Sequence, residues 1–189
     1  THDPTKTFEG LVNRSDYRFV YLHRDPRDAA VSWAYDFKRS GVCDPVTRRA
    51  IYMTFDQLLE MVVTHNIPPH VKEAVSWTRT NCKVITFDQI KENTLSVVLE
   101  ILDYCNYFDN SQYKPVSKHK ILEIVQKFSF KNIAKRERGQ EGPIIRDQYM
   151  VRKGISGEWK TAFSMDLLIK CYQIMGKEIQ ELGYPLDTF

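Results

Sequence analysis

The sequence predicts an α/β fold built on a parallel β-sheet. Two short runs rich in β-branched and aromatic residues, YRFVYL at 17–22 and KVITF at 83–87, predict buried strands. A helical pattern follows each of them, and strands that alternate with helices are typical of a parallel sheet. The 189 residues show no repeat or linker, so we expect a single domain over 1–189.

The first strand leads directly into a helix. Asp25 can cap this helix, Pro26 suits its first position, and Gly41 ends the pattern. Apolar residues recur between these signals at helical spacing: Ala29, Ala30, Trp33, Ala34 and Phe37. The turn after Leu22 is a candidate site, because ligands of parallel sheets bind beyond the carboxyl ends of the strands.

The rest of the chain predicts helices around one loop. The helices are expected at 55–64, 69–80 after Pro68-Pro69, 91–105, 117–128, 130–138 and from Ser164 to Leu182. The stretch 139–157 is rich in glycine and predicts a loop. The last helix is expected to turn five residues inward: Leu168, Cys171, Met175, Ile179 and Leu182. Two strands are few for an open parallel sheet, so we expect part of the sheet to lie outside this chain or to have escaped the pattern.

Composition excludes several classes of protein. A hydrophobic fraction of 42% and a charged fraction of 27% are ordinary for a globular chain, and no apolar run approaches the ~20 residues that span a bilayer. The cysteines are scattered (Cys43, Cys82, Cys105, Cys171), so we expect no metal site, no disulfide framework and a cytoplasmic setting. A net charge of +3 is weak support for nucleic acid, and we expect neither nucleic acid nor a membrane as partner.

Two short stretches carry candidate binding residues. Arg24 lies where the first strand gives way to its helix and Ser32 lies within that helix, an arrangement typical of an anion site. In the alternative, Arg24 pairs with Asp25 or Asp28 and Ser32 is a small interface residue.

Basic residues gather near the C-terminus and suit either an anionic small ligand or a solvated face: Lys131, Lys135, Arg136, Arg138, Arg146, Arg152 and Lys153.

The second stretch is RKGISGEWKTAF, residues 152–163. Gly154 permits a positive φ and a close approach of backbone to ligand, and Arg152 and Lys153 supply charge beside it. Trp159 suggests an anchor for the loop. The alternative is an ordinary exposed loop.

Five ordered segments together resemble the cytosolic sulfotransferase family. RKGISGEWKTAF resembles the family signature RKG-x-x-G-[DE]-W-K-x-x-F, and VYLHRDPRDAAVS resembles its 3′-phosphate motif. FDQIKEN and FSFKNI resemble two further family segments, and THDP at 1–4 resembles the K-T-H-x-P stretch with the catalytic histidine. The resemblance implies a P-loop-NTPase-like three-layer sandwich with a central parallel sheet, incomplete at its N-terminus.

The resemblance also implies a reaction and a site. The family moves a sulfuryl group from 3′-phosphoadenosine 5′-phosphosulfate (PAPS) to a hydroxyl or amine and releases adenosine 3′,5′-bisphosphate, without a metal. Carried over, the cofactor-binding residues are Arg24, Ser32, Phe87, Phe128, Phe130, Arg152, Lys153 and Gly154. The cations and Gly154 hold the 3′-phosphate, and Phe130 packs on the adenine. Phe87 and Phe128 stand where the family usually has Tyr and Thr.

His2 is the catalytic residue that the resemblance implies. A neutral imidazole is a competent general base near pH 7 and would take the proton of a small-molecule acceptor. From position alone, a histidine second from the end is an exposed residue. The other histidines have no partner residues at a spacing that suits catalysis, and we expect them to be structural or surface residues.

The chain departs from the family in two places. It lacks the Y-P-K-[SA]-G-[TN]-T-W loop that cradles the 5′-phosphosulfate, so we expect a fragment of a longer protein, the C-terminal two-thirds of a sulfotransferase domain, with a naturally shortened inactive relative as the alternative. The family's K-x-x-x-T-V-x-x-x-E dimer stretch is also poorly matched after Lys160, which leaves monomer and dimer open.

Two other functions stay open at this point. One is a non-catalytic 3′-phosphoadenosine-binding or interaction domain, and the other is a phosphoryl-transfer enzyme, which the absence of G-x-x-x-x-G-K-[ST] counts against. The acceptor cannot be named from the sequence. The loops 41–54 and 139–149 could line its pocket with Tyr35, Phe37, Tyr52 and Tyr149, or these rings are plain core.

Overall fold

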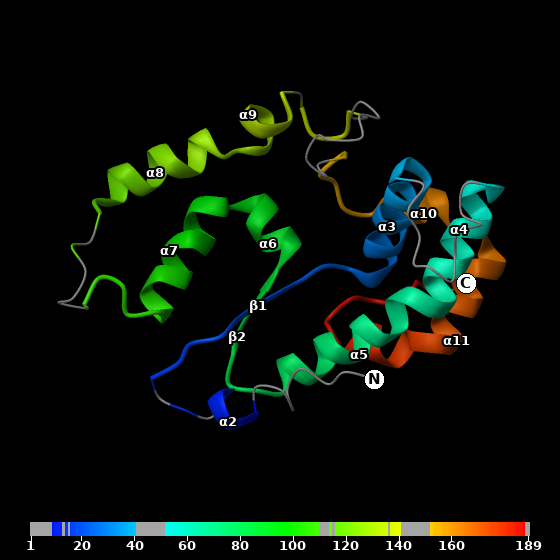
Figure 1. The fold of residues 1–189 in the computed structure, drawn as a ribbon, viewed down its shortest axis with the longest axis horizontal. Helices are drawn as coiled ribbons and strands as arrows, with labels where there is room; N and C mark the ends of the chain where they lie inside the picture. The colour runs from blue at the N-terminus through cyan, green and yellow to red at the C-terminus, as the bar shows by residue number, and fades with distance from the viewer. Residues whose placement is uncertain are drawn as a thin grey trace. The chain divides into compact units, whose positions relative to one another are not determined.

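The computed structural model describes residues 9–12, 14, 16–40, 52–109, 114, 116–135, 137–140 and 152–187 (Figure 1). The chain divides into two compact units, one of residues 1–24 and 76–138 and one of residues 25–75 and 139–189. The first unit contains the β-sheet, and the second contains helices and the glycine-punctuated loop. The expectation of one domain over 1–189 stays a prediction.

A pair of parallel strands forms the described sheet of the first unit. β1 (Val20–His23) pairs with β2 (Lys83–Thr86), with Val20 opposite Lys83 and His23 opposite Thr86. The two strands lie side by side in Figure 1. β1 begins later than the predicted 17–22 because the ladder opens where the Lys83 N–H donates to the Phe19 carbonyl, 2.8 Å away. The parallel α/β prediction is confirmed.

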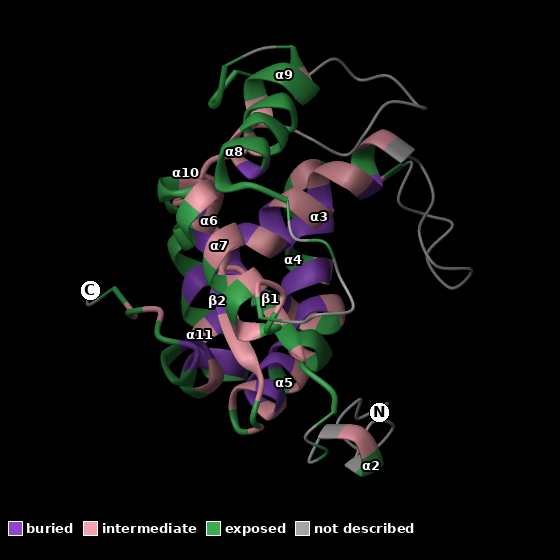
Figure 2. Ribbon diagram, turned by 90° about the vertical axis from the view of Figure 1, so that its left-hand side faces the viewer, coloured by how far each residue is buried: buried purple, intermediate pink, exposed green. Residues whose placement is uncertain are grey.

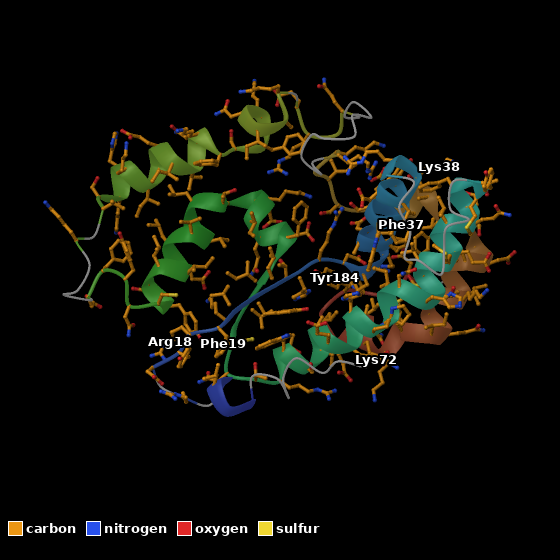
Figure 3. All side chains as sticks on the ribbon, viewed as in Figure 1. Arg18, Phe19, Phe37, Lys38, Lys72 and Tyr184 are labelled. Atoms are coloured by element: carbon orange, nitrogen blue, oxygen red, sulfur yellow. The ribbon has the colours of Figure 1, made fainter. Side chains whose placement is uncertain are left out.

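The two faces of β1 have different surroundings. The rings of Phe19, labelled in Figure 3, and Tyr21 lie 5.8 Å and 5.7 Å from that of Trp77, between centroids. Val20 and Leu22, on the other face, are 39% and 52% exposed. The prediction of a buried strand is therefore wrong for β1, in which Val20 and Leu22 are exposed and His23 is buried.

Short helices complete the first unit. They are α2 (Glu9–Val12), α6 (Phe87–Glu92), α7 (Thr94–Tyr104), α8 (Lys118–Lys127) and α9 (Phe130–Ala134). The predicted helix at 91–105 is interrupted at Asn93, which ends α6 and whose side chain caps α7 by accepting the Ser96 N–H at 3.0 Å. The predicted helix at 130–138 ends early because Lys135 takes a left-handed conformation with φ of 55°.

The second unit contains α3 (Pro26–Ser40), α4 (Phe55–Met61), the π-helix η3 (Val62–Asn66), the start of α5 (Ile67–Thr78), α10 (Trp159–Ala162) and α11 (Met165–Glu181). We predicted a break before Pro68-Pro69, whereas α4, η3 and α5 follow one another without a gap. The wider π turn, in which the Ile67 N–H bonds to Val62, leads into a first turn of α5 where proline is tolerated.

The apolar core of the second unit comes from α3, α4, η3, the start of α5, α10 and α11. Buried stretches of α3, α4, α5 and α11 are purple in Figure 2. Phe37 is buried while its neighbour Lys38 is exposed; both residues are labelled in Figure 3. The predicted cap and inward face of α11 are confirmed. The Ser164 hydroxyl accepts the Leu167 N–H, and the five predicted residues are buried together with Gly176: Leu168, Cys171, Met175, Ile179 and Leu182. Burial raises the pKa of the Cys171 thiol to about 12.

The described helices include none whose length and apolar character would allow it to cross a bilayer.

Candidate functional site

Two residues from separate sequence motifs meet at the carboxyl edge of the β1–β2 pair. Arg24 follows His23 and Phe87 follows Thr86, and these two preceding residues are partners in the strand register. The guanidinium carbon of Arg24 lies 4.8 Å from the centroid of the Phe87 ring. A cation held over an aromatic face at this edge is positioned to contact an anionic or aromatic ligand.

Local hydrogen bonds fix this edge. The Thr86 hydroxyl accepts the Gln89 N–H at 3.2 Å, and the Gln89 side chain accepts the Thr86 N–H at 2.8 Å, so a capping box starts α6 at Phe87. On the other strand, burial lowers the pKa of His23 and so favours its neutral imidazole.

The two other aromatic candidate site residues of the first unit, Phe128 and Phe130, lie at the start of α9. Phe128 caps the end of α8 and is 61% exposed. Phe130 is the first residue of α9, and the guanidinium carbon of Arg138 lies 4.9 Å from its ring centroid. Phe128 is therefore exposed, whereas Phe130 is half-buried beside Arg138.

The beginning of α3, in the second unit, is built around a buried ion pair. Asp25 caps the helix by accepting the Arg27 N–H at 2.9 Å, and its carboxylate also receives Nη2 of Arg27 at 2.7 Å. The Arg27 guanidinium lies 3.8 Å from the Trp159 ring centroid and donates to the Tyr172 hydroxyl at 2.9 Å. The predicted cap is confirmed. The Asp25 carboxylate forms its ion pair with Arg27.

Asp28 attaches the glycine-punctuated loop to α3. Its carboxylate, in a residue that is 1% exposed, accepts the Gly157 N–H at 2.7 Å and the Trp159 N–H at 3.1 Å. Gly157 has a φ of 81°, a conformation that L side chains rarely adopt. Trp159 is 3% exposed, so the predicted anchoring of the loop is confirmed. Ser32 follows one turn later in the same helix and is half-buried.

Glu158 holds the two cations of this loop. It receives Nη1 of Arg152 at 2.8 Å, Nη2 of the same guanidinium, and Nζ of Lys153 at 3.0 Å. The guanidinium carbon of Arg152 also lies 4.1 Å from the Tyr35 ring centroid. Gly154 has a φ of 63°, and the Lys153 carbonyl accepts the Gly139 N–H at 2.9 Å. The loop is thus an ordered structure and not a plain exposed segment.

Burial would raise the pKa of Glu158, but the hydrogen bonds and charges of Arg152 and Lys153 outweigh it and lower that pKa below its ordinary value. Glu158 and Asp28 were not identified as site residues from the sequence. An acidic residue inside a basic loop was the available signal for Glu158, and no local pattern distinguishes Asp28 from a helix-terminal carboxylate.

Several predicted residues lie outside the described part of the chain. They are His2, residues 41–51 of one proposed pocket loop and residues 141–149 of the other, Tyr149 included. Of the other proposed pocket rings, Phe37 is core, Tyr35 contacts Arg152 and Phe55, and Tyr52 is 88% exposed. Among the described residues, no group of three or more His, Cys, Asp or Glu side chains is placed to hold a metal ion.

Comparison with known proteins gives a family match along almost the entire chain. The family model described as the sulfotransferase domain matches residues 1–183. A protein named flavonol sulfotransferase-like, from Flaveria bidentis, is 23% identical over 98% of this chain and 62% of its own length. Sulfotransferase 1A1 of Canis lupus familiaris is 27% identical over 87% of this chain and 56% of its own. The chain therefore spans less than two thirds of these relatives.

Solved structures show the same fold. Mouse sulfotransferase SULT7A1, complexed with PAP, matches with a TM-score of 0.61 and 17% identity over 93% of this chain and 66% of its own. Retinol dehydratase, in a complex with retinol and PAP, matches with a TM-score of 0.59 and 17% identity over 91% and 50%. The resemblance to sulfotransferases and the P-loop-NTPase-like α/β fold class are thereby confirmed.

We predict that Asp28→Asn lowers the free energy of unfolding by about 1.5–3 kcal/mol, the scale of hydrogen bonds to a charged group. The amide that replaces the carboxylate loses the charge and turns a donor toward one of the two N–H groups. Urea denaturation measures the change, and Asp56→Asn, at an exposed position in the first turn of α4, is the matched control. Equal small losses in both variants would contradict the assignment.

We predict that the stability contributed by Glu158 is lost in acid. Its pKa in the folded protein is below the ordinary 4.5, so the contribution is complete above that value and disappears as the pH falls through the lower folded pKa. The difference in unfolding free energy between wild type and Glu158→Gln should therefore be largest at pH 7 and shrink as the pH falls below 4.5. A difference independent of pH in urea melts would refute this expectation.

Proposed function

The chain belongs to the sulfotransferase domain family, and from this premise we propose that it is the nucleotide-binding part of a PAPS-dependent sulfotransferase. In this proposal the protein moves a sulfuryl group from PAPS to a hydroxyl or amine of a small-molecule acceptor and releases adenosine 3′,5′-bisphosphate. The complete enzyme would include what the chain lacks relative to its longer relatives.

The observation that carries the proposal is the contact of Arg24 with Phe87 at the carboxyl edge of the sheet. The sequence motifs assigned both residues to the nucleotide independently, and they lie more than 60 positions apart. A guanidinium supplies charge for a phosphate, and the ring beside it supplies an apolar surface. We assign Phe130 to the adenine, with Phe128 on the nearby wall.

The loop of the second unit fits a phosphate in its chemistry. Arg152 and Lys153 carry two positive charges against one negative charge on Glu158, so the group keeps a net positive charge. Gly154 has a positive φ, a conformation that glycine adopts where a backbone approaches a ligand closely. We assign these three residues, together with Arg24 and Ser32, to the 3′-phosphate.

PAPS, when bound, supplies the sulfuryl group and a good leaving group. The protein's part in the reaction is to orient the nucleotide through the residues above and to remove a proton from the acceptor. We assign the proton transfer to His2, whose neutral imidazole Nε2 or Nδ1 can accept the acceptor's hydroxyl proton.

Two findings support the choice of nucleotide and acceptor class. The solved relatives were crystallised with PAP, and two of them held retinol or androsterone. From these two molecules we infer that the acceptor of this chain is an apolar small molecule that carries a hydroxyl. A cytoplasmic location and the absence of nucleic-acid and membrane partners stay predictions of the sequence, and monomer and dimer stay open.

We predict that Arg24→Ala and Arg152→Ala each weaken binding of adenosine 3′,5′-bisphosphate by about 1.5–3 kcal/mol, because each removes a charge-assisted hydrogen bond. Isothermal titration calorimetry measures the change, with 5′-AMP as the ligand that lacks the 3′-phosphate. Arg18→Ala, at an exposed position before β1, is the control. Unchanged affinity in both variants would contradict the assignment of the phosphate site.

We predict that His2→Ala abolishes turnover of the complete enzyme and leaves the affinity for adenosine 3′,5′-bisphosphate unchanged, since the imidazole acts on the acceptor and not on the nucleotide. Sulfate transfer to a panel of phenols and hydroxysteroids measures turnover. His70→Ala, at a surface position on α5, is the control. Full activity of His2→Ala would contradict the role, and an inactive wild type would favour the non-catalytic alternative.

A further inference from the structure

Arg152 and Lys153, the cations assigned to the phosphate, already share an anion of the protein itself. Both Nη atoms of Arg152 and the Nζ atom of Lys153 donate to the carboxylate of Glu158. The Glu158 side chain is 8% exposed, and those of Arg152 and Lys153 are 18% and 23% exposed. The three groups thus form one partly buried ion cluster with a single carboxylate at its centre.

We propose that Glu158 is an internal counter-ion that the 3′-phosphate displaces from Arg152, so that it sets which anions this loop binds. The inference rests on the proposed function. Its content is an exchange of anions: the carboxylate leaves the guanidinium as the phosphate oxygens take its place, and no covalent bond changes.

Glu158 occupies the edge of the Arg152 guanidinium that the two Nη atoms form. Nε of Arg152 is buried, and one face of the guanidinium lies over the Tyr35 ring at 4.1 Å. The two Nη atoms remain as the pair that can grip an anion in a bidentate manner, and both bond to Glu158. A phosphate that grips both Nη atoms in this bidentate manner therefore takes the place of the carboxylate.

The loop itself does not depend on the Glu158 side chain. The residues on either side of Glu158, Gly157 and Trp159, donate their backbone N–H groups to Asp28. Trp159 is buried, and Arg27 packs on its ring. The backbone stays anchored when the carboxylate turns away or is neutralised, so the cations remain close to their positions and become available.

Charge decides which anion wins the exchange. A phosphate monoester carries about −1.5 to −2 charges at pH 7, whereas the carboxylate carries one. A dianionic phosphate therefore displaces Glu158 more readily than a singly charged anion does. In this way Glu158 makes the loop selective for the dianionic 3′-phosphate over monoanions.

Calorimetry on the full-length protein and its Glu158→Gln variant tests the inference, with adenosine 3′,5′-bisphosphate and 5′-AMP as ligands. Glutamine keeps the size of the side chain and removes the competing charge. We expect the variant to bind the bisphosphate about tenfold more tightly, the scale of one charge-assisted hydrogen bond, and to bind 5′-AMP as the wild type does. Glu123→Gln is the control, because Glu123 also contacts two basic side chains, Lys120 and His119, at an exposed position.

Equal or weaker binding of the bisphosphate by a folded Glu158→Gln variant would overturn the inference while the proposed function stands. A wild type that shows no preference for the bisphosphate over 5′-AMP would overturn the proposed function and the inference with it. If Glu158→Gln does not fold, the crystal structure of the wild type with the bisphosphate decides. Phosphate oxygens in place of Glu158 on the Nη atoms of Arg152 support the exchange, and Glu158 still bonded to both rejects it.

Discussion

The carboxylate of Asp28 is the interaction on which the second unit depends. It is a buried charge, and a buried charge is costly unless polar groups surround it. Two backbone N–H groups, from Gly157 and Trp159, satisfy it across about 130 positions of sequence. The position of Asp28 in the first turn of α3 adds the favourable end of the helix dipole. The burial of Trp159 and the direction of the Glu158 side chain both follow from this attachment.

Local signals predicted most of the helices correctly. Asp25 and Pro26 start α3 and Ser164 starts α11, because caps and periodic apolar residues act within one or two turns. The errors have local causes of another kind. Asn93 divides a predicted helix by capping the next one. The π-helix η3 joins α4 to α5, whose first turn contains the proline pair. Both are choices between two allowed backbone paths, and the wider sequence pattern does not distinguish them.

The candidate site was predicted in part. The ends of parallel strands share one edge, so Arg24 and Phe87 could be expected to lie close together once both strands were identified. The roles of Asp28 and Glu158 depend on contacts that residue spacing does not encode. Resemblance to a family supplied the names of the candidate binding residues, and the geometry supplied the two carboxylates that hold the 152–159 loop.

The reactivity of the Cys171 thiol can report how often the core of the second unit opens. The thiolate is the reactive form of cysteine, and a thiol buried in α11 with a pKa of about 12 is almost entirely protonated at pH 7. An alkylating reagent therefore modifies Cys171 only in molecules whose α11 has separated from the core. Cys82 and Cys105, which are partly or fully exposed, react without such opening. The ratio of the two labelling rates measures how often this core opens, in the native protein and without any denaturant.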